Sequence, residues 1–294
     1  MGTITLDHRT VETSSLDKML FPSDGITKGE LIDYYRRIAD TMVPHLEGRP
    51  LTMRRFPDGI NGGGFYQQEM PDYFPEWIER VEVEKKGGKI VHALCNDAAT
   101  LVYLANQNTI TPHVWLSRTD RLHEPDQIVF DLDPPGGDFG AVRKAAQYVR
   151  ENLEERGLTA FVMTTGSSGV HVRAPIRRKH PFDAVRQYAR AIAAELAAQY
   201  PEELTVEQRK NKRRGRIYLD VMRIAYAQTA VPPYAVRARA GAPVATPIEW
   251  HELHSVEPDS YRIRNIFRRM GQKEDPWKRM AEAAADIRPS VDAT

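Results

Sequence analysis

The chain has 294 residues, which is enough for one large domain or two small ones. Hydrophobic residues make up 41% and charged residues 28% of it, an ordinary globular composition that excludes a disordered or collagen-like chain. The net charge of +1 excludes a strong overall attraction to nucleic acid, so any basic surface must be local.

The cysteine content and the N-terminal residues bear on the cellular compartment of the protein. Cys95 is the single cysteine, which excludes an internal disulfide and a Cys-based zinc site and fits a reducing compartment. The N-terminal residues contain no apolar signal core, and no stretch approaches the length of a membrane span. We therefore expect a cytoplasmic protein with no membrane partner.

The first strong periodic signal is a helix over residues 27–46. Thr27 can cap it, and Glu30, three residues later, completes a capping box ahead of an apolar stripe. A strand is expected next over residues 49–56, and it ends in the glycine-rich loop 57–65.

Further elements alternate between strand and helix along the chain. Runs of strand character flank a Lys-Gly-Gly turn and predict a hairpin, and a helical period follows it. Later segments give a strand, a helix, two strand-like runs around a Gly-Ser turn, a second helix and a last strand. In chain order these segments are residues 77–85 and 89–95, 97–109, 127–133, 139–157, 159–176, 182–201 and 216–225. The order indicates a mixed α/β (α+β) fold.

No linker rich in Pro, Gly or Ser divides the chain. We therefore expect a single domain over residues 1–294, with an N-terminal lobe at 1–120 and a catalytic lobe at 121–270. The polar end, residues 280–294, is expected to be a flexible tail.

Two aspartates at the end of the strand 127–133 are the first candidates for chemistry. Asp131 and Asp133 lie two apart on a strand, so their side chains point the same way. Two neighbouring carboxylates repel each other unless a cation lies between them, and hard ions such as Mg²⁺ or Mn²⁺ suit such a pair. A solvated strand end with two exposed acids is the alternative, and the short D-x-D pattern alone favours it.

A third acid changes that balance. Asp220 stands within the apolar run "RIYLDVM", where a carboxylate is rarely without a partner. Three such carboxylates can hold two cations about 3.5–4 Å apart, the arrangement used for nucleotidyl transfer. An ion pair of Asp220 with Arg216 or Arg223 is the alternative.

Candidate anion contacts surround these acids. Small residues from Gly166 to Gly169 allow backbone N–H groups to approach a phosphate, and His171 and Arg173 share one face of the strand that follows. A plain hairpin turn would explain the same residues. The segment 207–216 has six basic residues directly before Asp220, and 261–270 forms a second basic run.

Taken together, these motifs resemble the polymerase domain of bacterial DNA ligase D, a member of the archaeo-eukaryotic primase-polymerase superfamily that serves non-homologous end joining. The resemblance runs through "SSLDKMLFPSDGITKGELIDYY", "RPLTMRRFPDG", "HVWLSRTDRLHEPDQIVFDLDPP", "TTGSSGVHVRAPI", "YLDVMRIAYAQTAVPPYAVRAR" and "TPIEWHEL". It implies a primase-polymerase fold with an RRM-like catalytic sheet flanked by helices and a second, smaller sheet. No ligase or nuclease module is attached, so a stand-alone member is expected.

The resemblance implies roles for individual residues at the reaction centre. The metal-binding and catalytic aspartates are those already named, and a group of further residues contacts the incoming NTP or dNTP. Those residues are His113, Thr165, Ser167, Ser168, His171, Arg173 and Arg237. Ser168 replaces a lysine of the family motif, which predicts a weaker nucleotide site or one that depends on Arg173.

It also implies contacts to DNA. Lys18 and Lys28 match lysines that hold the 5′-phosphate of a downstream strand at a gap, and Ser15 stands where an asparagine is often seen. Phe65 and Tyr66 match an aromatic pair on the template strand. Arg213 falls in the basic loop before the third aspartate. Exposed rings on a loop can stack on bases, although they serve equally well as core anchors.

We therefore expect a template-directed nucleotidyltransferase, a DNA polymerase or primase that extends primers at gaps or ends during repair. It would use two divalent cations, Mn²⁺ or Mg²⁺, act on gapped DNA or on ends with a 5′-phosphate, and work at the nucleoid with Ku and a separate ligase. A non-catalytic DNA-end binding accessory and a metal-dependent D-x-D glycosyltransferase are the alternatives.

Overall fold

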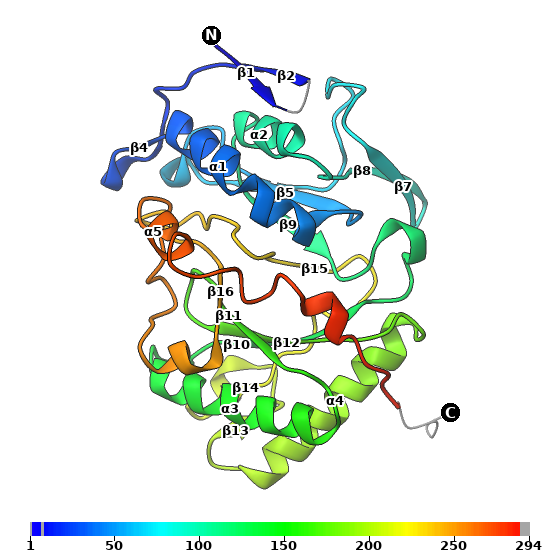
Figure 1. The fold of residues 1–294 in the computed structure, drawn as a ribbon. Helices are drawn as coiled ribbons and strands as arrows, with labels where there is room; N and C mark the ends of the chain where they lie inside the picture. Colours follow the sequence, from blue (N-terminus) through cyan, green and yellow to red (C-terminus); the bar gives the residue numbers. More distant parts are fainter. Residues whose placement is uncertain (1, 7–8, 289–294) are drawn as a thin grey trace. The chain divides into compact units, whose positions relative to one another are not determined.

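The computed structural model describes residues 2–6 and 9–288. The chain forms two compact units (Figure 1). Unit 1 comprises the described residues up to Asp120 together with Thr229–Ala245 and Tyr261–Lys273. Unit 2 comprises Arg121–Gln228, Thr246–Ser260 and the described residues from Glu274 onward. After Asp120 the chain passes between the two units four more times, so two short segments of the expected catalytic lobe belong to unit 1.

Unit 1 contains a four-stranded antiparallel sheet in the order β15-β9-β5-β6, three two-stranded hairpins and three helices. Its elements are β1 (Gly2–Leu6), β2 (Arg9–Thr13), β3 (Met19–Phe21), β4 (Ile26–Thr27), α1 (Lys28–Leu46), β5 (Leu51–Arg55), β6 (Phe65–Gln67), β7 (Arg80–Lys85), β8 (Gly88–Ala93), α2 (Ala98–Asn106), β9 (Thr109–Trp115), β15 (Thr229–Ala230) and α5 (Ile266–Met270).

Helix α1 shows why the sequence folds this way locally. The Thr27 side chain accepts a hydrogen bond from the Glu30 N–H, and the Glu30 side chain accepts one from the Thr27 N–H. The predicted capping box is thus confirmed. The apolar stripe of α1 is buried, and Tyr34 and Tyr35 donate their hydroxyl groups to the carbonyls of Tyr234 and Ile110. Helix α1 is thereby tied to the sheet strand β9 and to the segment that returns to unit 1.

Unit 2 contains a four-stranded antiparallel sheet in the order β10-β12-β11-β16 and two long helices. Its elements are β10 (Gln127–Leu132), α3 (Phe139–Glu155), β11 (Phe161–Thr164), β12 (Val170–Pro175), α4 (Phe182–Gln199), β13 (Leu204–Thr205), β14 (Ile217–Tyr218) and β16 (Thr246–Ile248). Asp220, after β14, forms a bridge to Asp131 on the free side of β10. The chain therefore runs β-α-β-β-α-β with spatial order 4-1-3-2, so the predicted RRM-like sheet is confirmed.

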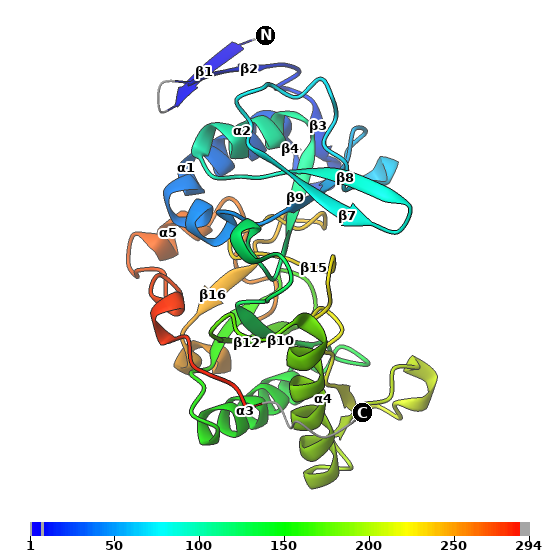
Figure 2. The same ribbon diagram turned by 90° about the vertical axis from the view of Figure 1, so that its right-hand side faces the viewer.

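The two faces of this sheet differ. Strand alternation places Asp131 and its cross-strand partner His171 on one face and Ile128, Phe130 and Leu132 on the other. Helices α3 and α4 contact each other and the strands of this sheet, α3 against β10 and β12 and α4 against β10 (Figure 2). Trp277, whose ring lies 5.5 Å from the Arg173 guanidinium, packs on the face that carries His171. The apolar face is therefore the one that α3 and α4 cover.

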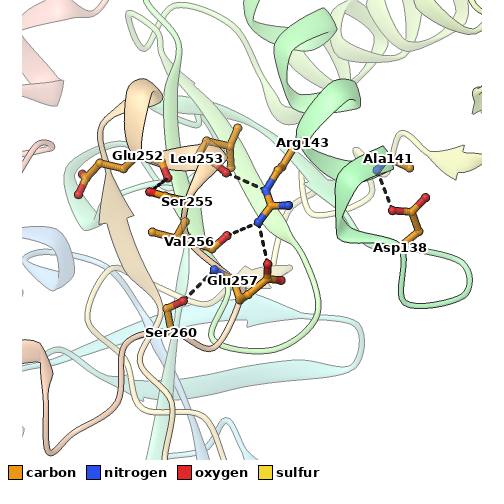
Figure 3. A network of polar contacts seen from close by, with 9 residues as sticks. All are labelled: Asp138, Ala141, Arg143, Glu252, Leu253, Ser255, Val256, Glu257 and Ser260. Atoms are coloured by element: carbon orange, nitrogen blue, oxygen red, sulfur yellow. Dashed lines mark hydrogen bonds and ion pairs between the residues drawn. The ribbon is translucent and has the colours of Figure 1, made fainter.

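Arg143 on α3 fastens the turn after β16. Its guanidinium donates to the carbonyls of Leu253 and Val256 and pairs with Glu257 at 2.8 Å (Figure 3). The same guanidinium lies over the ring of Phe139, the first residue of α3. The segment Thr246–Ser260 is thus held to the helix that follows the Asp131 and Asp133 strand.

Two expectations need correction. A strand over residues 216–225 is wrong beyond Tyr218, because the Asp220 side chain accepts the Met222 N–H and turns the chain. The expected flexible tail is wrong for its described part, since Ala285 pairs with Ile176 and Ile287 is buried. Residues 289–294 of that expected tail lie outside the described residues. Within the described part of the chain, no helix is long and apolar enough to cross a bilayer.

Candidate functional site

Three polar residues stand in one row across neighbouring segments of unit 2. Asp131 on β10 is paired with His171 on β12 on one side and bridged to Asp220 on the other. The Asp131 N–H donates to the Asp220 carbonyl at 2.8 Å. Directly opposed residues of an antiparallel pair have Cα atoms about 4.5–5.5 Å apart, with side chains on the same face. The structure thus brings two of the predicted metal ligands together, from positions 89 residues apart in the sequence.

Two nitrogen-bearing side chains face the Asp131 carboxylate from different directions. The Nε2 atom of His171 lies 3.4 Å from one oxygen, and Nε of Arg223 lies 3.6 Å from the other. The Asp131 side chain is only 13% exposed, whereas the Arg223 side chain is 45% exposed. Arg223 is therefore a solvent-facing cation at the edge of this site; its ion pair is with Asp131, and its charge also acts on Asp220.

Arg173 lies behind His171. Its guanidinium donates to the His171 Nδ1 atom at 2.9 Å and to the Gln127 side-chain oxygen at 3.0 Å, and the residue is 2% exposed. An arginine can only donate, so Nδ1 of His171 must be the acceptor. A neutral His171 therefore carries its proton on Nε2, the atom that faces Asp131. This placement connects Arg173 to the site through His171.

Asp133 follows β10 and contacts the loop 165–169. The Ser168 hydroxyl donates to an Asp133 carboxylate oxygen at 2.7 Å. Gly169 allows this approach, because a Cβ atom there would lie 1.9 Å from the Leu132 carbonyl oxygen. The Thr165 hydroxyl closes the loop through hydrogen bonds with the Gly169 backbone, and Ser167 at the loop tip is half-buried. The five residues of this loop therefore form a compact cap beside the second predicted metal ligand.

The electrostatics of the acids are unfavourable without a counter-charge. Burial raises the pKa of Asp220, and the nearby Asp131 carboxylate raises it further, while the hydrogen bond from the Met222 N–H acts in the opposite direction. Oxygen ligands on adjacent strands suit a divalent cation, which would relieve this repulsion, so the residues present fit such an ion. Among the described residues, no three His, Cys, Asp or Glu side chains already converge as a metal cluster.

The basic loop before β14 has a mixed character. Arg213 donates to the carbonyls of Glu207 and Gln208 and lies over the Tyr218 ring. Its guanidinium thus fastens the loop to β14, close in sequence to Asp220. The exposed cations of the loop are Arg209, Lys210, Lys212 and Arg214.

In unit 1, one face of the four-stranded sheet is polar. His113 on β9 is paired with Thr52 on β5, and its ring meets the Tyr66 ring of β6 at 5.6 Å. Tyr66 and Phe65 are 60% and 47% exposed, so these rings are on the surface rather than in the core. Arg237 follows Val236, whose carbonyl accepts the hydroxyl of Thr111 on β9. His113 and Tyr66 therefore share one face of this sheet, near Arg237, whereas Phe65 pairs with Arg55 and points to the opposite face.

The two predicted phosphate lysines also meet in unit 1. The Lys28 N–H donates to the Lys18 carbonyl at 2.8 Å, and Lys28 begins helix α1. Lys28 is 3% exposed, and burial together with the charge of Lys18 lowers its pKa to about 8. Ser15 has a φ of 52°, in the left-handed region, and its carbonyl accepts the Lys18 N–H. Two cations beside a helix N-terminus form a site prepared for an anion.

Comparison with known proteins decides between the alternatives. The family described as LigD, primase-polymerase domain, matches residues 27–277. The chain belongs to this family. As a LigD-type primase-polymerase domain it is an enzyme of the nucleotidyltransferase class, and the glycosyltransferase alternative is no longer needed.

Individual relatives agree with this assignment. The chain is 31% identical over 271 residues to the multifunctional non-homologous end joining protein LigD of Mycolicibacterium smegmatis, covering 91% of this chain and 36% of that protein. It is 30% identical over 273 residues to the bifunctional non-homologous end joining protein LigD of Bacillus subtilis, covering 92% of this chain and 44% of that protein. The chain thus spans less than half the length of these curated relatives.

A solved structure confirms the fold. The polymerase domain from Mycobacterium tuberculosis ligase D, in complex with DNA, superposes with a TM-score of 0.86 at 27% identity, over 93% of this chain and 99% of that chain. The LigD-type fold predicted from the sequence is therefore confirmed.

Sequence reasoning missed three residues of this LigD-type domain that the structure places at the candidate site. The sequence pattern suggests Arg223 only as a partner of Asp220 and indicates no separate role for Gln127 or Gly169. A signal exists for Gln127, because it lies four residues from Asp131 on the same face of the same strand. The contact of Gly169 with Leu132 depends on the pairing of β10 with β12, which local sequence does not reveal.

Proposed function

We propose that this LigD-type polymerase domain extends a primer strand by template-directed nucleotidyl transfer at DNA gaps or broken ends, in non-homologous end joining. The observation that carries the proposal is the bridge between Asp131 and Asp220, which places two carboxylates next to each other. Burial of the Asp220 carboxylate makes its negative charge costly without a cation. The printed names of the relatives, which are end-joining proteins, and of the solved neighbour, which binds DNA, support the choice of reaction and of substrate.

Asp131, Asp133 and Asp220 are the residues that would hold the divalent cations, Mn²⁺ or Mg²⁺. Such ions would neutralise developing charge on the phosphates and activate the primer 3′-hydroxyl. The chain itself holds the carboxylates in place. The Met222 N–H orients Asp220, Ser168 orients Asp133, and His171 faces Asp131.

The nucleotide contacts remain proposals by family resemblance. Ser168 and His171 contact the carboxylates, and with Ser167 at the loop tip they are proposed to donate to the phosphates of an NTP or dNTP, while Thr165 closes the loop. By the same resemblance, His113 and Arg237 are also proposed to contact the nucleotide. We assign Arg173 to positioning His171 with its Nε2–H directed toward the acids.

The lysine pair is proposed to bind the 5′-phosphate of the downstream strand. Within the described part of the chain, Lys28 has no ion pair, and its only charged neighbour with an effect on its pKa is Lys18. A phosphate would supply the missing counter-charge. Phe65 and Tyr66 are proposed to stack on template bases, and the exposed cations of the loop with Arg213 to attract the DNA backbone.

A gapped-duplex assay tests the proposal. The expected result is addition of the nucleotide complementary to the template, dependent on Mn²⁺ or Mg²⁺ and stimulated by the downstream 5′-phosphate. All eight nucleotides are compared, because ribose preference does not follow from the residues above. Tight, phosphate-dependent binding without any addition would favour the non-catalytic end-binding alternative.

The setting is proposed on the same basis. End joining takes place on chromosomal DNA, so the protein would work in the cytoplasm at the nucleoid, together with Ku and a DNA ligase. Co-purification from cells with broken chromosomes, using each partner as bait, would test these associations.

A further inference from the structure

Arg264 makes four hydrogen bonds to the first turn of α1 and the segment before it, although it lies 234 residues from Glu30 in the sequence. Its Nε and Nη2 atoms donate to one Glu30 oxygen at 3.0 and 2.9 Å. Its Nη1 donates to the Asp24 carbonyl at 3.0 Å, and Nη2 also donates to the Gly25 carbonyl at 3.2 Å. Both residues belong to unit 1, and Arg264 precedes α5 within the second basic run of the sequence.

Glu30 links Arg264 to the residue that precedes Lys28. Its other oxygen accepts the Thr27 N–H at 3.1 Å, and the Thr27 hydroxyl accepts the Glu30 N–H at 3.2 Å. The next residue is Lys28, which is tied to Lys18 through its own N–H. Hydrogen bonds thus connect Arg264 through Glu30 to Thr27, whose peptide bond leads to the buried lysine.

Charge gives Arg264 a second effect. The Glu30 carboxylate lies in the first turn of α1, two residues from Lys28, where it would oppose an approaching phosphate. Arg264 neutralises the Glu30 carboxylate with two N–H groups of its planar guanidinium. A lysine at this position could not donate to the carboxylate and to two carbonyls with the same geometry.

We propose that Arg264 is a positioning residue of the lysine-pair site, which orients the N-terminus of α1 and cancels the Glu30 charge so that Lys18 and Lys28 can select a 5′-phosphate. This inference rests on the proposed phosphate role of the lysine pair. The Arg264 and Glu30 side chains are 56% and 39% exposed, and exposed ion pairs add little to global stability. The effect of Arg264 should therefore be seen in phosphate selection rather than in unfolding.

The test measures affinity for two gapped duplexes that differ only in a downstream 5′-phosphate or 5′-hydroxyl. The proteins are the unaltered chain, Lys28→Ala, Arg264→Ala, Arg264→Lys and Arg268→Ala. Arg268 is the matched control, since it is an exposed arginine on the adjacent helix α5. We expect Arg264→Ala to lower the phosphate preference about fivefold, equivalent to about 1 kcal/mol, with hydroxyl-duplex binding nearly unchanged. Arg264→Lys should lie between, and Arg268→Ala should keep the full preference.

The outcomes separate the inference from the site on which it rests. If the unaltered chain shows no phosphate preference, the lysine-pair site and the inference both fall. If Lys28→Ala loses the preference but Arg264→Ala keeps it, the inference alone is overturned. Equal weakening of both duplexes by Arg264→Ala would indicate a general structural role and would also overturn it. Should Arg264→Ala fail to fold, the same comparison with Arg264→Lys decides.

Discussion

Single residues carry the chemistry of this domain, and the desolvated carboxylate of Asp220 is the clearest case. Its pKa is raised by burial and by Asp131, so the charged form destabilises the folded, metal-free protein. This cost to the free energy of unfolding is absent at pH values below the pKa of Asp220 in the unfolded chain, which is near 3.9. It appears as the pH rises through the raised pKa of Asp220 in the folded protein. A residue so placed favours function over stability.

We therefore predict that Asp220→Asn raises the melting temperature of the metal-free protein at pH 7 but not at pH 3.5. The asparagine oxygen can still accept the Met222 N–H, so only the charge is removed. Mn²⁺ should stabilise the unaltered chain more than the variant. Glu151→Gln, at an exposed position on α3, is the control and should change neither value. A variant less stable than the parent at pH 7 would contradict the account.

Arg173 gives a second prediction at this scale. Replacing it with leucine removes the donor to His171 Nδ1, so the ring can adopt either tautomer. We expect kcat to fall about tenfold, the usual effect of losing a side chain that orients another site residue. The affinity for DNA should not change. Nitrogen NMR of the His171 ring in the nucleotide-free protein provides the direct check. The parent should show a non-protonated Nδ1, and the same spectrum in the leucine variant would argue against a positioning role.

At the scale of elements, the close approach of β10 and β12 depends on Gly169. A Cβ at this position would overlap the Leu132 carbonyl oxygen, so the strand ends would have to separate. We predict that Gly169→Ala destabilises the fold by about 1–3 kcal/mol, the usual cost of overpacking, and abolishes extension. Gly136 lies in the loop after Asp133 with open space around its Cβ, and Gly136→Ala should be nearly neutral. Urea unfolding of both variants makes the comparison.

The start of α1 gives a prediction with a pH dependence. Lys28 has a pKa of about 8, lowered by burial and by Lys18, so it loses its charge as the pH rises through that value. The preference for a 5′-phosphate should therefore decline between pH 7 and pH 9. Lys28→Arg remains charged throughout and should keep its preference at pH 9. A pH-independent preference in the unaltered chain would indicate that Lys28 does not contact the phosphate.

The elements also show what the sequence could predict. Helices α1, α3 and α4 begin and end within about two residues of their expected bounds, because capping and 3.6-residue periodicity are local signals. The segment around Asp220 was expected to be a long strand, but its pairing is a single bridge to Asp131. Short edge segments of this kind are set by tertiary contacts, which leave little trace in local composition.

At the scale of the whole molecule, the sequence motifs predicted the family and the RRM-like sheet, and both are confirmed. The division into units was less accessible. Segment 229–245 joins unit 1 through bonds of Val236, Tyr234 and Gly241. Segment 261–273 joins it through bonds such as that of Arg264 to Glu30. Such contacts across more than 100 residues have no periodic signal. The roles of the individual site residues stay predictions.

Charge distribution is also a property of the whole chain. With a net charge of only +1, attraction to DNA must come from local groups such as the exposed cations of the loop 207–216. Replacing Lys210 and Lys212 with glutamine should make the plot of log affinity against log salt concentration less steep, by the amount expected for the loss of about two phosphate contacts. The slope of affinity against salt concentration, measured for both proteins, would show it. An unchanged slope would place the DNA elsewhere.

The most direct test of the central claim is nucleotide addition on a gapped duplex in the presence of Mn²⁺, with the unaltered chain and Asp131→Asn compared at equal DNA occupancy. We predict addition of the template-complementary nucleotide by the unaltered chain. The rate for Asp131→Asn should be more than about a thousandfold lower, since several kcal/mol of charge stabilisation is lost. Comparable rates for the two proteins, or addition that ignores the template, would contradict the account.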